Sequence, residues 1–122
     1  MTQVIKGKRG FDLEERTALF GEDVIEFCKS LKQTSISMPL ISQIVRSSTS
    51  IGANYMEANG ASSRKDFSNK IFICKKESME TKHWLRMLKK CYAQEESRIN
   101  KLWNEAQELT LIFSKIGSTL KK

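Results

Sequence analysis

The chain has 122 residues with one Pro and six Gly, which suits a single domain with few interruptions of regular structure. Its net charge of +7 favours polyanionic partners, although a charge of this size also serves solubility. No apolar run approaches the roughly 20 residues of a membrane span, and the first residues lack the apolar core of a signal peptide. We therefore expect a cytoplasmic protein with no membrane association.

Residues 1–10 contain three cations and no acid, and they predict a flexible basic arm ahead of one helical domain over residues 11–120. The first predicted helix runs from about Asp12 to Lys32, and acidic residues in its first turn complement the helix dipole. Its core positions alternate spacings of four and three, which is typical of a helix packed in a bundle. These positions are Leu13, Thr17, Phe20, Val24, Phe27 and Leu31.

The second predicted helix starts near Pro39, because proline is tolerated in the first turn of a helix. We expect it to end at Asn59-Gly60, with Gly60 in the left-handed conformation that commonly stops a helix. Its buried stripe is expected to contain Ile41, Ile44, Ser48, Ile51 and Tyr55.

The third predicted helix begins with a capping-box-like start at Ser63 and runs to about Tyr92. A fourth helix follows a tight connection near residues 93–96 and is expected to end at Gly117. Four amphipathic helices joined by short loops predict an all-α, antiparallel, up-down-up-down four-helix bundle. The core positions of these two helices are Phe67, Ile71, Cys74, Ser78, Thr81, Leu85, Leu88 and Tyr92, then Ile99, Leu102, Ala106, Leu109, Phe113 and Ile116.

A polar line on the second helix lies opposite its apolar stripe. It consists of Arg46, Ser50, Asn54 and Glu57, at spacings of four, four and three. The line could be a polar pocket or a ligand contact, or it could be structural, either as a solvated face or as a hydrogen-bonded network that locks two helices or two subunits together. We favour the structural network, with Arg46 paired to Glu77 or Glu80, because a guanidinium fork suits a carboxylate.

The third helix carries a second apolar strip, about 100° around the helix from its core stripe. The strip consists of Ile73, Trp84, Met87 and Cys91. A wide core would account for it, but a bundle helix needs only one buried face. We therefore expect this strip to form an interface between subunits.

Most of the excess positive charge lies in residues 64–94, which contain nine Lys and Arg residues but only three acidic residues. Four of these cations, Lys75, Lys82, Arg86 and Lys89, form one line beside the core stripe, with Lys65 and Lys90 nearby. Such a line can follow a phosphate backbone without reading bases, although an ordinary solvated flank has the same pattern. No aromatic residue interleaves with the line, so the pattern does not indicate stacking on single-stranded bases.

Metal and catalytic chemistry find little support in the residues. A Glu-x-x-His unit, as used in di-iron bundles, occurs once at Glu80 and His83, and His83 is the only histidine. Three cysteines (Cys28, Cys74 and Cys91) have no metal-site spacing, and we expect them to be reduced. There is no phosphate loop and no nucleophile motif. We expect a protein that is not an enzyme and needs no metal or cofactor.

The second and third predicted helices contain the most distinctive residues, namely Gln43, Arg46-Ser47, Ser50-Ile51-Gly52-Ala53-Asn54, Glu57-Ala58, Asp66-Phe67, Lys70, Lys76-Glu77, Glu80-Thr81 and Trp84-Leu85. In these residues the chain resembles the bacterial four-helix-bundle family of 23S rRNA intervening-sequence proteins. That family includes relatives that serve as accessory variability proteins of diversity-generating retroelements. The resemblance covers Phe11 to Ser118.

The resemblance implies a homopentamer, a ring of bundles around a central channel, with basic surface available to nucleic acid. Two hypotheses follow. In the first, the protein binds RNA or other nucleic acid through the basic third helix. In the second, it is a protein-interaction scaffold or accessory subunit for a partner enzyme such as a reverse transcriptase. Bound nucleic acid or protein recovered from the native complex would discriminate between them.

Overall fold

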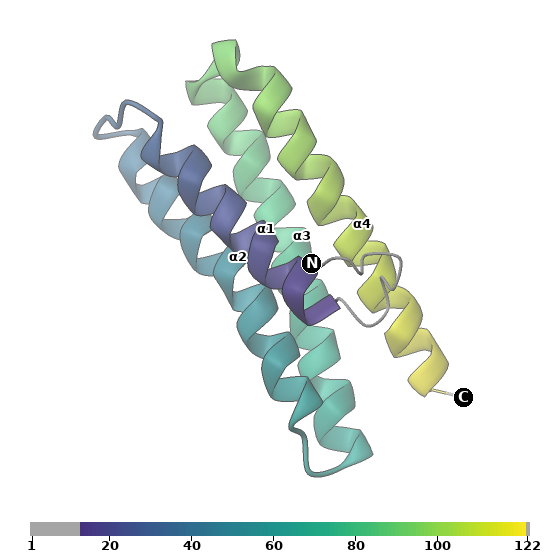
Figure 1. Ribbon diagram of the computed structural model, residues 1–122. Coiled ribbons are helices and arrows are strands. Elements are labelled where there is room, and N and C mark those ends of the chain that lie inside the picture. The colour runs from purple at the N-terminus through teal and green to yellow at the C-terminus, as the bar shows by residue number, and fades with distance from the viewer. Residues whose placement is uncertain (1–12, 122) are drawn as a thin grey trace.

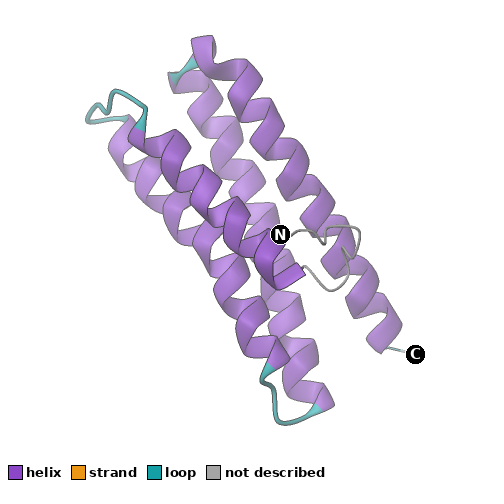
Figure 2. Ribbon diagram, viewed as in Figure 1, coloured by secondary structure: helices purple, strands orange, loops and turns teal. Residues whose placement is uncertain are grey.

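The computed structural model describes residues 13–121, so the basic arm predicted for residues 1–10 lies outside the described residues. All regular structure in the described part is helical, as the sequence predicts (Figure 2). Short connections join four α-helices, and a single 3₁₀ turn, Ala93–Glu95, precedes the last of them. The helices are α1 (Leu13–Lys29), α2 (Ser37–Asn59), α3 (Arg64–Cys91) and α4 (Glu96–Leu120).

The four helices lie side by side, and the chain turns back at each connection (Figure 1). α2 packs extensively on α1 and α3, and α3 packs extensively on α4. α1 and α4 touch less, and Arg16 bridges them by donating to both carboxylate oxygens of Glu105, at 2.7 and 2.8 Å, and to Glu108 at 2.6 Å. Consecutive helices therefore supply most of the packing, and α3 is central to it.

Local capping explains where α2 and α3 begin. The Ser63 hydroxyl accepts a hydrogen bond from the backbone N–H of Asp66 at 3.0 Å, which confirms the predicted start of α3. α2 begins at Ser37, two residues before Pro39. There, the Thr34 hydroxyl accepts from the N–H of Ser37 at 3.1 Å, and the Ser37 hydroxyl accepts from the N–H of Thr34 at 2.9 Å. This reciprocal pair leaves Pro39 inside the first turn.

α2 ends at Asn59 as predicted but with a different conformation at Gly60, and α1 and α4 end elsewhere than predicted. Gly60 has φ −99° and ψ 12°, so it is not left-handed; its N–H bonds to the Glu57 carbonyl at 3.1 Å and tightens the last turn of α2. The same kind of tightened turn ends α1 at Lys29 and not at Lys32. α4 passes through Gly117 and continues to Leu120, because glycine weakens a helix without ending it.

The predicted core stripes meet in one hydrophobic core. Four predicted core residues are only half-buried at its edge: Tyr55, Phe67, Leu102 and Ile116. Cys28 and Cys74 are buried, Cys91 is exposed, and all three are free thiols. None of the helices in residues 13–121 is both long and apolar enough to cross a bilayer.

Candidate nucleic-acid interface

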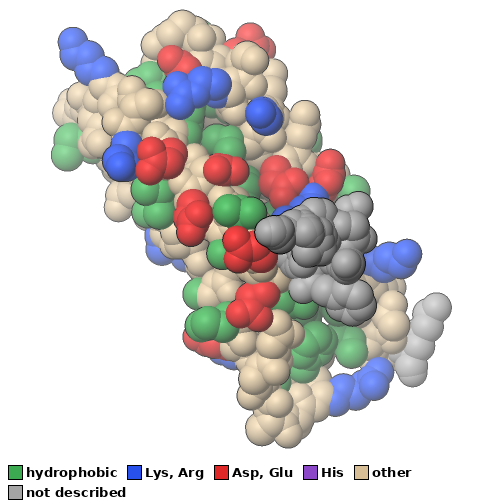
Figure 3. All heavy atoms as spheres, viewed as in Figure 1, with side chains coloured by type: hydrophobic (Ala, Val, Ile, Leu, Met, Phe, Trp, Pro, Cys, Tyr) green, Lys and Arg blue, Asp and Glu red, His purple; other side chains and the backbone are tan. Residues whose placement is uncertain are grey.

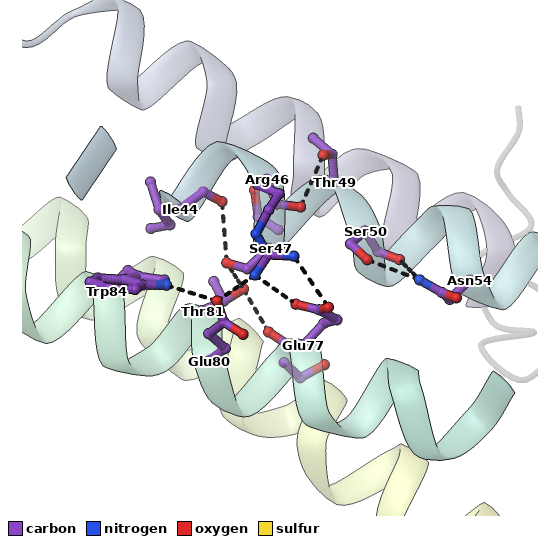
Figure 4. Close-up of polar contacts among 12 residues, drawn as sticks. Ile44, Arg46, Ser47, Thr49, Ser50, Asn54, Glu77, Glu80, Thr81 and Trp84 are labelled. Atoms are coloured by element: carbon purple, nitrogen blue, oxygen red, sulfur yellow. Dashed lines mark hydrogen bonds and ion pairs between the residues drawn. The ribbon is translucent and has the colours of Figure 1, made fainter. Parts of the chain in front are cut away.

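A polar network joins α2 to α3 on one side of α3 (Figure 4). The guanidinium of Arg46 donates to the two carboxylate oxygens of Glu77, at 3.3 and 3.2 Å, and also to Glu80. Glu77 is only 7% exposed, whereas Arg46 is half-exposed. Arg46 therefore pairs with both Glu77 and Glu80, which the sequence offered as alternatives. Its pKa is raised by the hydrogen bonds that it donates to Glu77, which have the larger effect, and to Glu80.

Trp84 belongs to this network as well. Its indole N–H donates to Glu80 at 3.1 Å, and its ring packs against the core (Figure 4). Burial acts to raise the pKa of Glu80, but the hydrogen bonds from Trp84 and Arg46 outweigh burial and lower it. Deeper between the same helices, the hydroxyls of Ser47 and Thr81 lie 2.8 Å apart. The network locks α2 to α3.

The other members of the predicted polar line have separate partners. The Asn54 amide donates to the carbonyl and to the hydroxyl of Ser50, at 2.9 Å each (Figure 4). Glu57 forms an ion pair with Lys70 across the α2–α3 contact, at 2.7 Å. The predicted line is thus three local groups, each with partners inside the molecule.

The basic line occupies the opposite side of α3, toward α4. Lys82 donates to the Gln107 amide oxygen at 2.5 Å, and its ammonium lies 5.2 Å from the ring centroid of Trp103. Lys89 lies 3.9 Å from a carboxylate oxygen of Glu96. Within residues 13–121, no carboxylate lies within 4.0 Å of the charged groups of Lys75, Lys82 or Arg86.

Lys65 and Lys90 are exposed near the two ends of α3, and the rise of an α-helix separates them by roughly 37 Å. They extend the basic surface along the length of the helix, with Lys65 ten residues before Lys75 and Lys90 directly after Lys89. Acidic side chains gather elsewhere, over α1 (Figure 3). The exposed acids of α1 are Glu14, Glu15, Glu22, Asp23 and Glu26.

A depression of about 400 Å³ opens between α3 and α4, within the basic line. Its lining residues are Leu85, Arg86, Lys89, Ile99, Asn100 and Trp103. Trp103 corrects the expectation that no aromatic residue interleaves with the cations. The sequence pattern of α3 alone could not reveal it, because α4 supplies the ring from a position far along the chain.

The predicted subunit strip is less exposed than expected. Ile73, Trp84 and Met87 are half-buried, and only Cys91 is exposed. The large exposed apolar residues of α3 are instead Phe72, at 65%, and Met79, at 50%. Phe72 and Met79 are seven residues apart and so lie on one helix face, and this spacing could have revealed an exposed apolar face in the sequence. Neither residue belongs to the core stripe or to the predicted strip.

Residues 13–121 contain no cluster of three or more His, Cys, Asp and Glu side chains that could hold a metal ion. Glu80 is occupied by Arg46 and Trp84. His83 is exposed and lies edge-on to the Trp84 ring, with the centroids 4.8 Å apart. Glu80 and His83 therefore make contacts with neighbouring side chains and not with each other.

Comparisons with known proteins agree with the resemblance seen in the sequence. The profile of the 23S rRNA-intervening sequence protein family matches residues 11–115. A crystal structure of a protein with unknown function from the S23 ribosomal protein family of Bacteroides thetaiotaomicron superposes with a TM-score of 0.78 at 32% sequence identity. The match covers 85% of this chain and 96% of that one. No functionally curated protein matches significantly.

Neither the family description nor that of the solved relative indicates an enzyme. The family match covers most of the chain, including all of α1, α2 and α3 and the part of α4 that carries Trp103. The chain belongs to the 23S rRNA-intervening sequence protein family.

Proposed function

We propose that this protein is a non-enzymatic, cytoplasmic helical bundle that binds RNA or other nucleic acid through the α4-facing side of α3. The observation that carries the proposal is the separation of charge around α3. Glu77 and Glu80 face α2 and are held by Arg46. The cations of the basic line lie on the other side, where Glu96 is the nearby carboxylate.

This separation matters because acids interspersed among the cations would cancel their field. With the acids of α3 held on its far side, the basic line presents positive charge along α3, and Glu96 of α4 approaches it only at Lys89. Lys75 and Lys89 are separated by 14 residues, roughly 21 Å along the helix axis. A phosphate backbone following this line would meet several cations in succession and release its counterions.

We also propose that the protein acts as an antiparallel up-down-up-down bundle assembled into a homopentamer. The half-buried Ile73 and Met87, with exposed Cys91, lie along one flank of α3 and would supply its contacts. This flank is separate from the basic line, so assembly would repeat the cations around a ring and leave them accessible. Repetition would strengthen binding to a long polyanion by multivalency.

The test replaces the four central cations, in the variant Lys75→Glu, Lys82→Glu, Arg86→Glu and Lys89→Glu. The probe is a labelled mixed-sequence RNA, and binding is followed by fluorescence anisotropy. We expect binding to be abolished while circular dichroism still shows a folded helical protein. The four side chains lie beside the core and not in it, so the fold is retained.

A matched control makes the same change of charge elsewhere, in Lys29→Glu, Lys32→Glu, Lys101→Glu and Lys121→Glu. All four of these lysines are exposed, and none lies on the basic line. If charge alone drives a diffuse attraction, both quadruple variants will lose binding equally, which contradicts a defined interface on α3.

Exposed Phe72 and Met79 favour the second candidate, an accessory subunit that docks a partner enzyme such as a reverse transcriptase. If the variant of the basic line binds RNA as well as the parent does, this candidate takes the lead. Phe72→Ser combined with Met79→Ser should then remove the partner from the native complex.

A further inference from the structure

The α3–α4 depression brings apolar, cationic, amide and aromatic side chains together. Its floor is apolar, since Leu85 and Ile99 are buried core residues. Its rim carries the cations of Arg86 and Lys89 and the amide of Asn100, and Trp103 forms an aromatic wall. Its volume of about 400 Å³ falls within the range of roughly 300–1,000 Å³ that is usual for small-molecule sites.

We infer that this depression takes a base of single-stranded nucleic acid, stacked on Trp103 while the adjoining phosphates meet Arg86 and Lys89. This inference rests on the proposed function and adds the class of nucleic acid to it. A duplex encloses its bases and offers only edges and backbone, whereas a single strand can present the face of a base. An aromatic ring set among cations is how single-strand binders combine stacking with backbone contact.

Trp103 is available for this role and is held in place. Trp103 lines the depression and is 37% exposed, so a ligand can reach it. Lys82 lies over the ring at 5.2 Å and is itself fixed by Gln107. This contact ties the α4 indole to α3 and places a cation over one face of the ring, so a base would stack on the other face with a partner for its phosphate nearby.

Asn100 and Phe72 add to the site in different ways. The Asn100 side chain offers one hydrogen-bond acceptor and two donors to a base edge, and this combination can pair with several bases.

Phe72 is 65% exposed and lies three residues before Lys75, so the two share a helix face. Its ring is roughly 21 Å from Arg86 along α3, where a neighbouring stretch of the same strand could stack.

The experiment compares Trp103→Leu and Trp103→Phe with the parent. Leucine retains apolar bulk without an aromatic face, whereas phenylalanine retains the face. The probes are a labelled single-stranded RNA of about 12 nucleotides, a length within the known site sizes of single-strand binders, and the duplex that it forms with its complement. Affinities are measured by fluorescence anisotropy at one fixed salt concentration.

We expect Trp103→Leu to weaken single-strand binding roughly 10- to 100-fold and to leave duplex binding unchanged, with Trp103→Phe recovering most of the loss. If Trp103→Leu changes neither affinity while the charge-reversed variant of the basic line binds no RNA, the proposed function stands and the base site is wrong. If the parent binds neither probe, the proposed function itself fails, and the base site fails with it.

Discussion

Arg46 on α2 holds Glu77 on α3 through two guanidinium nitrogens, although Glu77 is almost fully buried and Arg46 is half-exposed. Arg46 therefore covers the buried carboxylate of Glu77 on its solvent side. Removing the cation would leave that carboxylate without its charged partner, and this is costly because a buried charge cannot recover its hydration. Surface exposure of Arg46 reduces the cost below that of a fully buried pair.

We expect Arg46→Ala to lower the free energy of unfolding by about 1–3 kcal/mol, measured by urea denaturation. Arg46→Lys should recover part of the loss, because one ammonium cannot donate to both acids in the same geometry. The double variant Arg46→Ala with Glu77→Gln completes a thermodynamic cycle. Additive losses in that cycle would mean that the pair contributes no coupling.

Glu80 should give the bundle a stability that depends on pH. Its pKa in the folded protein is lowered below the ordinary value of 4.5, so the folded state binds this proton less readily than the unfolded chain does. The stabilisation is therefore present above the ordinary pKa and is lost as the pH falls through the folded value.

The variant Glu80→Gln cannot titrate at this position and tests the pH dependence. It should be less stable than the parent at about pH 7, and the difference should shrink at about pH 3, because a group whose pKa is lowered by folding loses its stabilisation as the pH falls. Urea midpoints at the two pH values provide the measurement. A difference that stays constant between them would assign the stabilisation to packing and not to ionisation.

Tyr92 should stabilise the end of the bundle where α1 and α2 are connected. Its hydroxyl lies 2.7 Å from the Lys32 carbonyl, to which it donates, and 2.7 Å from the buried Ser37 hydroxyl. We expect Tyr92→Phe to cost about 1–2 kcal/mol in thermal unfolding without changing the helix content. Tyr55→Phe is the matched control, since Tyr55 is half-buried at the core edge; an equal loss there would mean that the hydroxyl bonds of Tyr92 are not decisive.

Binding to nucleic acid should weaken steeply with salt. Four phosphate contacts by Lys75, Lys82, Arg86 and Lys89 predict that log K falls with log salt at a slope of about 3 for each bound subunit. Titrations at several salt concentrations measure the slope. Replacing Lys75 alone with Gln should reduce it by somewhat less than one; an unchanged slope would place Lys75 outside the interface.

Assembly should depend on the flank of α3 that carries Ile73 and Met87. We expect light scattering at micromolar concentration to give a mass near five times the 14.0 kDa of one chain, and Met87→Asp to lower it. Trp84→Ala is the less specific variant, because Trp84 also contacts Glu80 and the core. A parent protein that elutes as a 14.0 kDa monomer would contradict the pentamer.

The helices and the core could be predicted from the sequence, because both depend on local spacing. Alternating intervals of four and three place Val24, Ile44, Leu85 and Leu109 on the inner faces of their helices, and all four are fully buried. Ser63 identified the start of α3 through the same kind of local chemistry. The end of α2 at Asn59-Gly60 was also predicted correctly, although Gly60 is not left-handed. The end of α4 at Gly117 was wrong, because glycine permits a stop but does not require one.

The composition of the candidate site depended on tertiary structure. Periodicity gives the direction of a side chain around its own helix axis, but not which neighbouring helix lies in that direction. The rotation and register of whole helices decided that Arg46 meets both acids of α3 and that Trp103 of α4 lies beside Lys82. The sequence by itself determined that α3 is basic, and the packing of α2 and α4 against it determined where its charge is cancelled and where it stays available.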